Sequence, residues 1–113
     1  MGYDTSVRDQ AVARDRERRE ELRLRMLQAI KEALAAHAKE LGIDYAYIHG
    51  SVIRPGAFRD DSDIDVAVPE ANPVVVAGRL THAVGREVHV LELDDSRAAR
   101  RARTEGMLWT RTK

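Results

Sequence analysis

The spacing of apolar residues divides the chain near residue 42 into a helical part and a part with strand character. Residues 5–41 contain neither proline nor glycine and are rich in arginine, glutamate, alanine and leucine, a composition that favours helix. Apolar residues recur there with helical spacing, in one row at Leu22, Met26, Ile30 and Leu34 and in an adjacent row at Leu27, Ala38 and Leu41. This stripe predicts a long helix that packs on a sheet, with the charged segment 14–21 as a solvated extension.

Beyond Gly42 the period changes from that of a helix to that of strands. Residues 44–50 are rich in β-formers, and residues 63–68 and 87–93 alternate between apolar and polar side chains. Both features are typical of short strands, so we expect three of them.

Two further helices are expected after the second and third strands. Residues 72–85 begin with Asn72 as a candidate N-cap and Pro73 at the first helical position, and they end at Gly85. Residues 94–109 predict a terminal helix that Asp95 or Ser96 caps.

The order of elements predicts an α/β fold in which a small mixed sheet of three or more strands packs with helices, preceded by the long N-terminal helix. We divide the chain into an N-terminal helical extension, residues 1–42, which packs on the domain, and the domain itself, residues 43–113.

Composition narrows the class of partner. The 113 residues include 19 basic and 19 acidic side chains, so a net charge of zero gives no bulk attraction to nucleic acid or to a membrane. The chain has no cysteine, which excludes thiolate metal sites and fits a reducing compartment. No apolar run approaches the roughly 20 residues that span a bilayer. We therefore expect a cytoplasmic protein without a membrane partner.

The segment YIHGSVIRPGAFRDDSDIDVAV, residues 47–68, carries the candidate chemistry. Gly50 and Ser51 end one predicted strand, and Asp63 and Asp65 lie on one face of the next, with Cα atoms about 6–7 Å apart. A carboxylate in an apolar strand is costly unless a cation or a hydrogen bond compensates it. The pattern predicts that Asp63 and Asp65 bind a divalent metal ion, with Mg²⁺ suited to such an oxygen site, beside a turn that can receive phosphate.

At these residues the chain resembles the DNA polymerase beta nucleotidyltransferase superfamily, whose signature is a glycine–serine pair followed by two aspartates separated by one apolar residue. The small size and the strings GREVHVLELDD and EGMLW make it most similar to the minimal nucleotidyltransferase (MNT) group. The resemblance covers roughly residues 43–109.

The resemblance implies roles for individual residues. Gly50 and Ser51 would hold the triphosphate of ATP, with Arg54 as a charge partner, while Asp63 and Asp65 would hold Mg²⁺ or Mn²⁺ against it. The chemistry of the family is transfer of a nucleotidyl group to a hydroxyl, with pyrophosphate leaving. Many MNT proteins are antitoxins, and the resemblance implies a HEPN-domain toxin as the partner.

His89 stands where the family has a third carboxylate. Imidazole is a poorer ligand for Mg²⁺ and suits Mn²⁺ or Zn²⁺ better. His89 could serve as a ligand or as a base at the acceptor hydroxyl, and Glu87, on the same face of the strand, could reach into the site. Two function classes stay open: a nucleotidyltransferase with a weakened or altered site, and a non-catalytic antitoxin or nucleotide-binding module that acts by contact.

Overall fold

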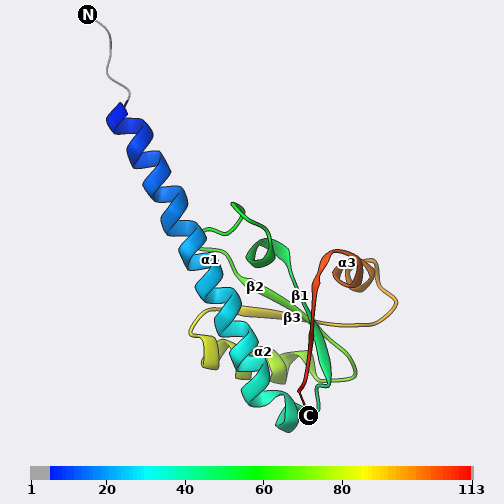
Figure 1. The fold of residues 1–113 in the computed structure, drawn as a ribbon. Helices are drawn as coiled ribbons and strands as arrows, with labels where there is room; N and C mark the ends of the chain where they lie inside the picture. The colour runs from blue at the N-terminus through cyan, green and yellow to red at the C-terminus, as the bar shows by residue number, and fades with distance from the viewer. Residues whose placement is uncertain (1–5, 113) are drawn as a thin grey trace, which may run out of the picture.

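Three helices and a four-stranded sheet make up the fold in the computed structural model, which describes residues 6–112 (Figure 1). In chain order the elements are α1 (Ser6–Leu41), β1 (Tyr45–His49), the 3₁₀ helix η1 (Gly50–Ile53), β2 (Ile64–Val68), α2 (Pro73–Val84), β3 (Val88–Glu92), α3 (Arg97–Glu105) and β4 (Met107–Thr110). The expected α/β class is confirmed, and so is the long N-terminal helix, although residue 5 lies outside the described range.

The sheet is mixed, with strand order β3-β2-β1-β4. β1 runs antiparallel to both of its neighbours, whereas β2 and β3 are parallel. In this register His49 lies opposite Asp65, and Asp65 lies opposite His89. The pairing therefore lines up one residue from each of three strands in a row across the sheet.

The core lies on one face of the sheet, beneath α1 and α2, whereas α3 lies on the other side (Figure 1). Ile30 and Leu34 of α1 are fully buried there against strand residues such as Ile48 and Val66. The apolar stripe of α1 packs as the sequence predicted. Alternation along the strands leaves the opposite face free for polar side chains, and that face carries the candidate site.

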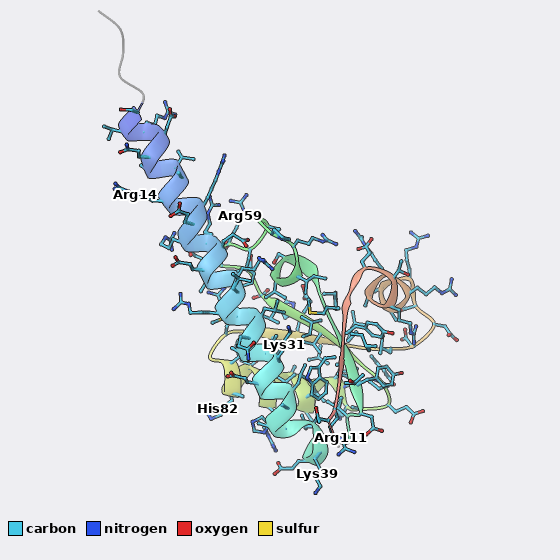
Figure 2. All side chains as sticks on the ribbon, in the orientation of Figure 1. Arg14, Lys31, Lys39, Arg59, His82 and Arg111 are labelled. Carbon is cyan, nitrogen blue, oxygen red and sulfur yellow. The ribbon has the colours of Figure 1, made fainter. Side chains whose placement is uncertain are left out.

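The N-terminal end of α1 extends beyond the rest of the fold (Figures 1 and 2). Its contacts near that end are polar: Arg18 pairs with Asp60 of the loop before β2 at 3.1 Å, and both side chains are exposed. Exposed ion pairs of this kind contribute little to stability. The described residues include no helix of the length and apolarity that crossing a membrane requires.

The predicted terminal helix is wrong beyond Glu105. Gly106 has an extended backbone, and Met107–Thr110 form β4, which pairs with β1 from Tyr45↔Thr110 to Ile48↔Met107. The free edge of β1 decides this, because strand pairing satisfies backbone groups that both segments would otherwise leave to water. Gly106 also has no room for a side chain, since a Cβ there would collide with the Ala102 carbonyl oxygen.

The other helix boundaries follow the local signals. Asn72 caps α2 by accepting hydrogen bonds from the Val74 and Val75 amides, and Gly85 ends it in a left-handed conformation. Ser96, rather than Asp95, caps α3 by accepting from the Ala99 amide at 3.1 Å.

Candidate functional site

Gly50 turns the chain from β1 into η1 at a position that only glycine fits. Its φ is +78°, in the left-handed region, and a Cβ there would lie 2.5 Å from Asp65 Oδ2. Both the backbone and the close approach of a carboxylate therefore require glycine. The glycine–serine turn and Asp65 are therefore neighbours in space.

The segment after this turn is anchored to α1. Arg23 is only 7% exposed and donates a hydrogen bond from Nη1 to the Val52 carbonyl at 3.1 Å. The same guanidinium binds both carboxylate oxygens of Glu20, which in turn accepts from the Gly56 amide at 2.7 Å. Helix α1 thus fixes η1 and the loop that follows it.

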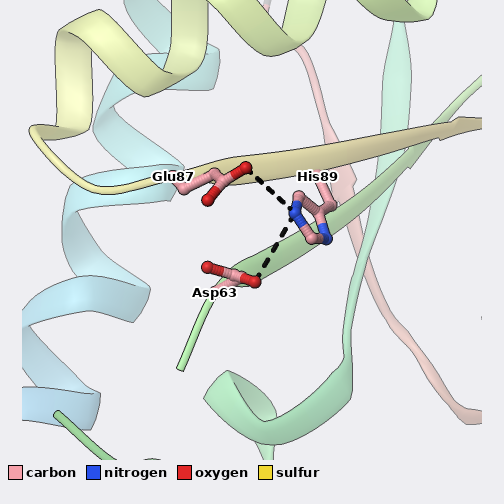
Figure 3. A group of neighbouring side chains, drawn as sticks. All are labelled: Asp63, Glu87 and His89. Atoms are coloured by element: carbon pink, nitrogen blue, oxygen red, sulfur yellow. Dashed lines mark hydrogen bonds and ion pairs between the residues drawn. The ribbon is translucent and has the colours of Figure 1, made fainter. Parts of the chain in front are cut away.

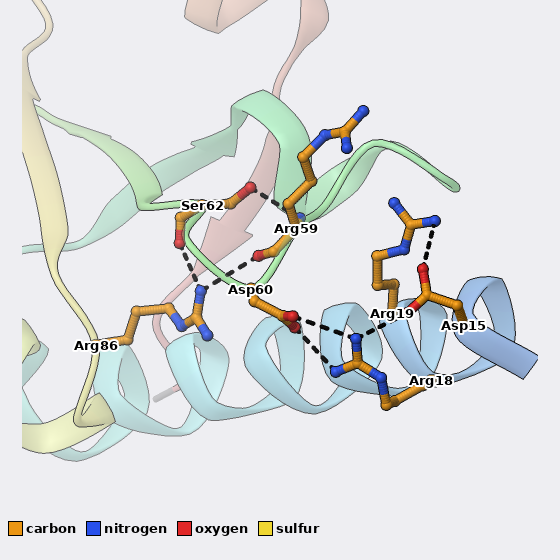
Figure 4. A network of polar contacts seen from close by, with 7 residues as sticks. All are labelled: Asp15, Arg18, Arg19, Arg59, Asp60, Ser62 and Arg86. Carbon is orange, nitrogen blue, oxygen red and sulfur yellow. Dashed lines mark hydrogen bonds and ion pairs between the residues drawn. The ribbon is translucent and has the colours of Figure 1, made fainter.

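The loop that leads into β2 is fixed from the other side by Arg86 (Figure 4). Its guanidinium donates to the Ser62 carbonyl at 2.7 Å and lies 5.0 Å from the ring centroid of buried Phe58. These contacts hold the residue before Asp63, so the position of the Asp63 carboxylate is set by the loop as well as by the strand.

Asp63, Glu87 and His89 form a cluster at the start of the parallel β2–β3 pair (Figure 3). His89 Nε2 lies 3.2 Å from Glu87 Oε1 and 3.5 Å from Asp63 Oδ2, and His89 Nδ1 lies 3.8 Å from Asp65 Oδ1. The expected approach of Glu87 to the site is thus observed. His89, 56% exposed in its side chain, stands at the centre of three carboxylates.

Burial perturbs two groups in the row across the sheet. Burial raises the pKa of the Asp65 carboxyl, an effect that His49 and His89 oppose and the negative charge of Asp63 reinforces. Burial lowers the pKa of the His49 imidazole, and Asp65 opposes that shift while Arg54 adds to it. The site therefore holds one carboxyl that resists ionisation beside one imidazole that resists protonation.

The remaining predicted residues, Ser51 and Arg54, lie after the Gly50 turn. Ser51 is half-buried in η1, and no group within residues 6–112 forms a hydrogen bond with its hydroxyl. Arg54 is exposed and pairs with Glu105 of α3, Nη2 to Oε2 at 3.0 Å. The structure thus brings Asp63, Asp65 and His89 into contact and Gly50 against Asp65, whereas Arg54 is directed to α3.

Sequence reasoning missed His49, Arg23 and Glu105. His49 was visible as the residue before the glycine–serine pair, at a spacing that puts it on the same face as Tyr47. Arg23 was visible only as a basic residue beside the apolar Leu22. No local signal connects Glu105 with Arg54, because that contact depends on how α3 packs.

The donor set fits a divalent cation. One ligand atom from each of Asp63, Glu87 and His89 lies within 4.8 Å of the others, and the Asp65 carboxylate adjoins the same imidazole. Carboxylate oxygens suit Mg²⁺ and Mn²⁺, and the imidazole shifts the preference toward Mn²⁺ or Zn²⁺. The Asp65 carboxylate, which contacts Gly50 on one side and His89 on the other, links this cluster to the turn.

Comparisons with known proteins do not assign the chain to a family. No family model matches the chain, and no curated protein or solved structure matches it significantly.

Proposed function

We propose that this chain is a metal-dependent nucleotidyltransferase. It transfers a nucleotidyl group from a nucleoside triphosphate to a hydroxyl, and the group we propose is AMP, from ATP. The observation that carries the proposal is the convergence of Asp63, Asp65, Glu87 and His89 beside the Gly50 turn. The motif resemblance supplies the reaction, and this cluster supplies groups of the kind that the reaction needs.

In the proposed mechanism the phosphates bind at the turn formed by Gly50 and Ser51, where the serine hydroxyl has no hydrogen-bond partner among the described residues 6–112. Asp63, Asp65 and one of the pair Glu87 and His89 would hold Mn²⁺ or Mg²⁺, which when bound neutralises phosphate charge. The acceptor oxygen forms a bond to the α-phosphorus, and the bond to pyrophosphate breaks. The other member of the pair takes the proton of the acceptor hydroxyl, because both side chains are exposed and neither would be needed twice.

The acceptor in this proposal is a HEPN-type toxin, for which the chain would serve as a cytoplasmic antitoxin. Support for the partner comes from the similarity of residues 43–109 to the MNT group. The balanced net charge supports a protein acceptor over nucleic acid.

The test is incubation of the full chain with ATP labelled in its α-phosphate, Mn²⁺ or Mg²⁺, and a HEPN-type partner. We expect label on the partner and a higher melting temperature of the chain with ATP and metal. The double substitution Asp63→Asn with Asp65→Asn should abolish both, whereas Asp61→Asn in the exposed loop is the matched control. If the double variant kept both the label on the partner and the thermal shift, the proposed metal site and the proposed reaction would both be wrong.

A second candidate is a non-catalytic module that binds nucleotide and neutralises its partner by contact. His89 favours it, because an imidazole occupies the place where the family has a third carboxylate. In the same assay this function gives the thermal shift with ATP and metal but no label on the partner.

A further inference from the structure

A cavity of about 240 Å³ lies between α3 and the sheet face that carries Asp65. Gly50 and His49 line it from the end of β1, Leu91 from β3, and Ala98 and Ala102 from α3. His49 is the cross-strand neighbour of Asp65. The cavity therefore adjoins the candidate site directly, and the mechanism described above does not use it.

We propose that this cavity, called here the α3 cavity, receives the nucleobase of the triphosphate and that His49 is the hydrogen-bonding residue that reads it. The inference rests on the proposed function, because it assigns a place to one part of the same substrate. His49 Nε2 is buried and has no hydrogen-bond partner within residues 6–112. A buried polar atom of this kind is costly. Rotation of the imidazole toward the cavity would bring Nε2 within reach of a base, which offers both donors and acceptors that can satisfy it.

The size of the α3 cavity favours one nucleobase over a whole nucleotide. Sites that enclose whole drug-sized ligands measure roughly 300–1,000 Å³, and this one is smaller. Leu91, Ala98 and Ala102 supply apolar surface for the faces of a base. The phosphates of the same molecule would remain outside, beside Gly50, which belongs to both the cavity and the turn.

The charged groups around the α3 cavity suit a phosphorylated ligand. Glu105 Oε2 accepts hydrogen bonds from Arg54 Nη2 and Arg101 Nε, each at 3.0 Å. Two guanidinium groups thus share one carboxylate and leave a net positive charge at the cavity. This charge opposes the approach of a cationic ligand and favours an anionic one.

The test compares two ligands of the full chain in the presence of Mn²⁺: ATP, and inorganic tripolyphosphate, which has the phosphates without the nucleoside. We expect ATP to bind at least about tenfold more tightly. Ala98→Leu, which fills the α3 cavity from an exposed helix position, should reduce ATP affinity to that of tripolyphosphate and leave tripolyphosphate binding unchanged. Ala36→Leu, at an exposed position of α1, is the matched control.

His49→Phe tests the assignment of the hydrogen bond, since it keeps an aromatic ring and removes both ring nitrogens. We expect it to reduce the preference among ATP, GTP, CTP and UTP, while Ala98→Leu weakens all four. Equal affinities for ATP and tripolyphosphate in the parent chain, or ATP binding that Ala98→Leu does not change, would overturn the nucleobase site alone. If Ala98→Leu blocks transfer but leaves ATP binding unchanged, the cavity belongs to the acceptor, and the nucleobase site is overturned by that result also. Failure of both ligands to bind with Mn²⁺ would instead remove the proposed function.

Discussion

Gly50 and Asp65 approach each other so closely that a methyl group on Gly50 would lie 2.5 Å from Asp65 Oδ2. The contact joins the turn after β1 to the carboxylate on β2. The contact explains why a glycine is needed opposite Asp65: the Asp65 carboxylate occupies the space that a side chain at position 50 would fill.

Gly50→Ala should therefore cost more stability than the strained backbone alone. We expect a loss of about 3 kcal/mol in the free energy of unfolding, measured by urea denaturation, because the methyl group must displace the Asp65 carboxylate. Metal binding should weaken with it.

Gly85→Ala is the control for backbone strain, because Gly85 has the same φ of +78° and open space around the position of a Cβ. It should cost about 1 kcal/mol. Adding Asp65→Ala to Gly50→Ala should reduce the loss toward the Gly85→Ala value. Equal losses in the two single glycine variants would show that the contact carries no energy.

Asp65→Asn should stabilise the metal-free chain at neutral pH. Burial raises the pKa of Asp65 above its usual value of 3.8, so the folded chain binds this proton more tightly than the unfolded chain does. The cost of ionisation is absent below 3.8, develops as the pH rises to the raised folded value and is complete above it. Urea denaturation from pH 3 to pH 7 in a chelator should show the advantage of Asp65→Asn grow with pH. If the difference in the free energy of unfolding between Asp65→Asn and the parent chain did not change with pH, or matched that of the loop control Asp61→Asn, the prediction would be contradicted.

His89→Asp should change the metal preference of the proposed transfer reaction. The natural cluster includes one imidazole, which favours Mn²⁺, whereas an all-carboxylate cluster favours Mg²⁺. We expect the ratio of rates with Mn²⁺ and Mg²⁺ to fall about tenfold, and the Mn²⁺ rate to fall by about 100-fold if the imidazole is the base. Gln10→Asp, at an exposed position of α1 far from the cluster, controls for added charge. A large rise in rate, with ATP affinity unchanged, would mean that the natural site lacks a working ligand and would favour the binding module.

Arg23→Met should loosen the Gly50–Ser51 turn from a distance. The substitution keeps apolar volume but leaves the buried Val52 carbonyl without its donor, a loss of about 2 kcal/mol in the free energy of unfolding. Because η1 loses its link to α1, affinity for tripolyphosphate with Mn²⁺ should also fall. Arg25→Met, exposed on the same helix, should change neither measurement. An unaffected affinity would restrict Arg23 to a role in stability.

Deletion of residues 1–18 should leave the fold intact. Within the described part of this segment, the side chains are almost all exposed, and the contact with Asp60 is an exposed ion pair. The melting temperature should shift by less than about 3 °C. Ile30→Asp, which buries a charge at a fully buried position, should instead unfold the chain. A folded Ile30→Asp variant, or a deletion that unfolds, would mean that the stability of α1 has another source.

The sequence predicted those elements whose signals are local. Asn72, Pro73 and Gly85 mark the ends of α2 within the helix itself, and the stripe of α1 needs only a period. Met107–Thr110 could not be recognised as a strand, because the partner that makes it one lies at Tyr45–His49, far away in the chain.

The same distinction applies to the candidate site. Gly50, Asp63 and Asp65 were recognisable because a motif with fixed spacing carries them. The contact of Arg23 with Val52 and that of Glu105 with Arg54 depend on how α1 and α3 pack. No spacing in the sequence encodes that packing.

The strand order has a consequence for folding while the chain is being synthesised. β1 lies inside the sheet, yet its second neighbour, β4, is synthesised about 60 residues later. At translation rates of about 5–20 residues per second, β1 waits roughly 3–12 s with one edge unpaired. During that interval the nascent chain presents an open strand edge beside the apolar Ala46 and Ile48, which is the kind of surface that aggregates or recruits chaperones. The last strand of this sheet to emerge from the ribosome is therefore the one that closes this edge of β1.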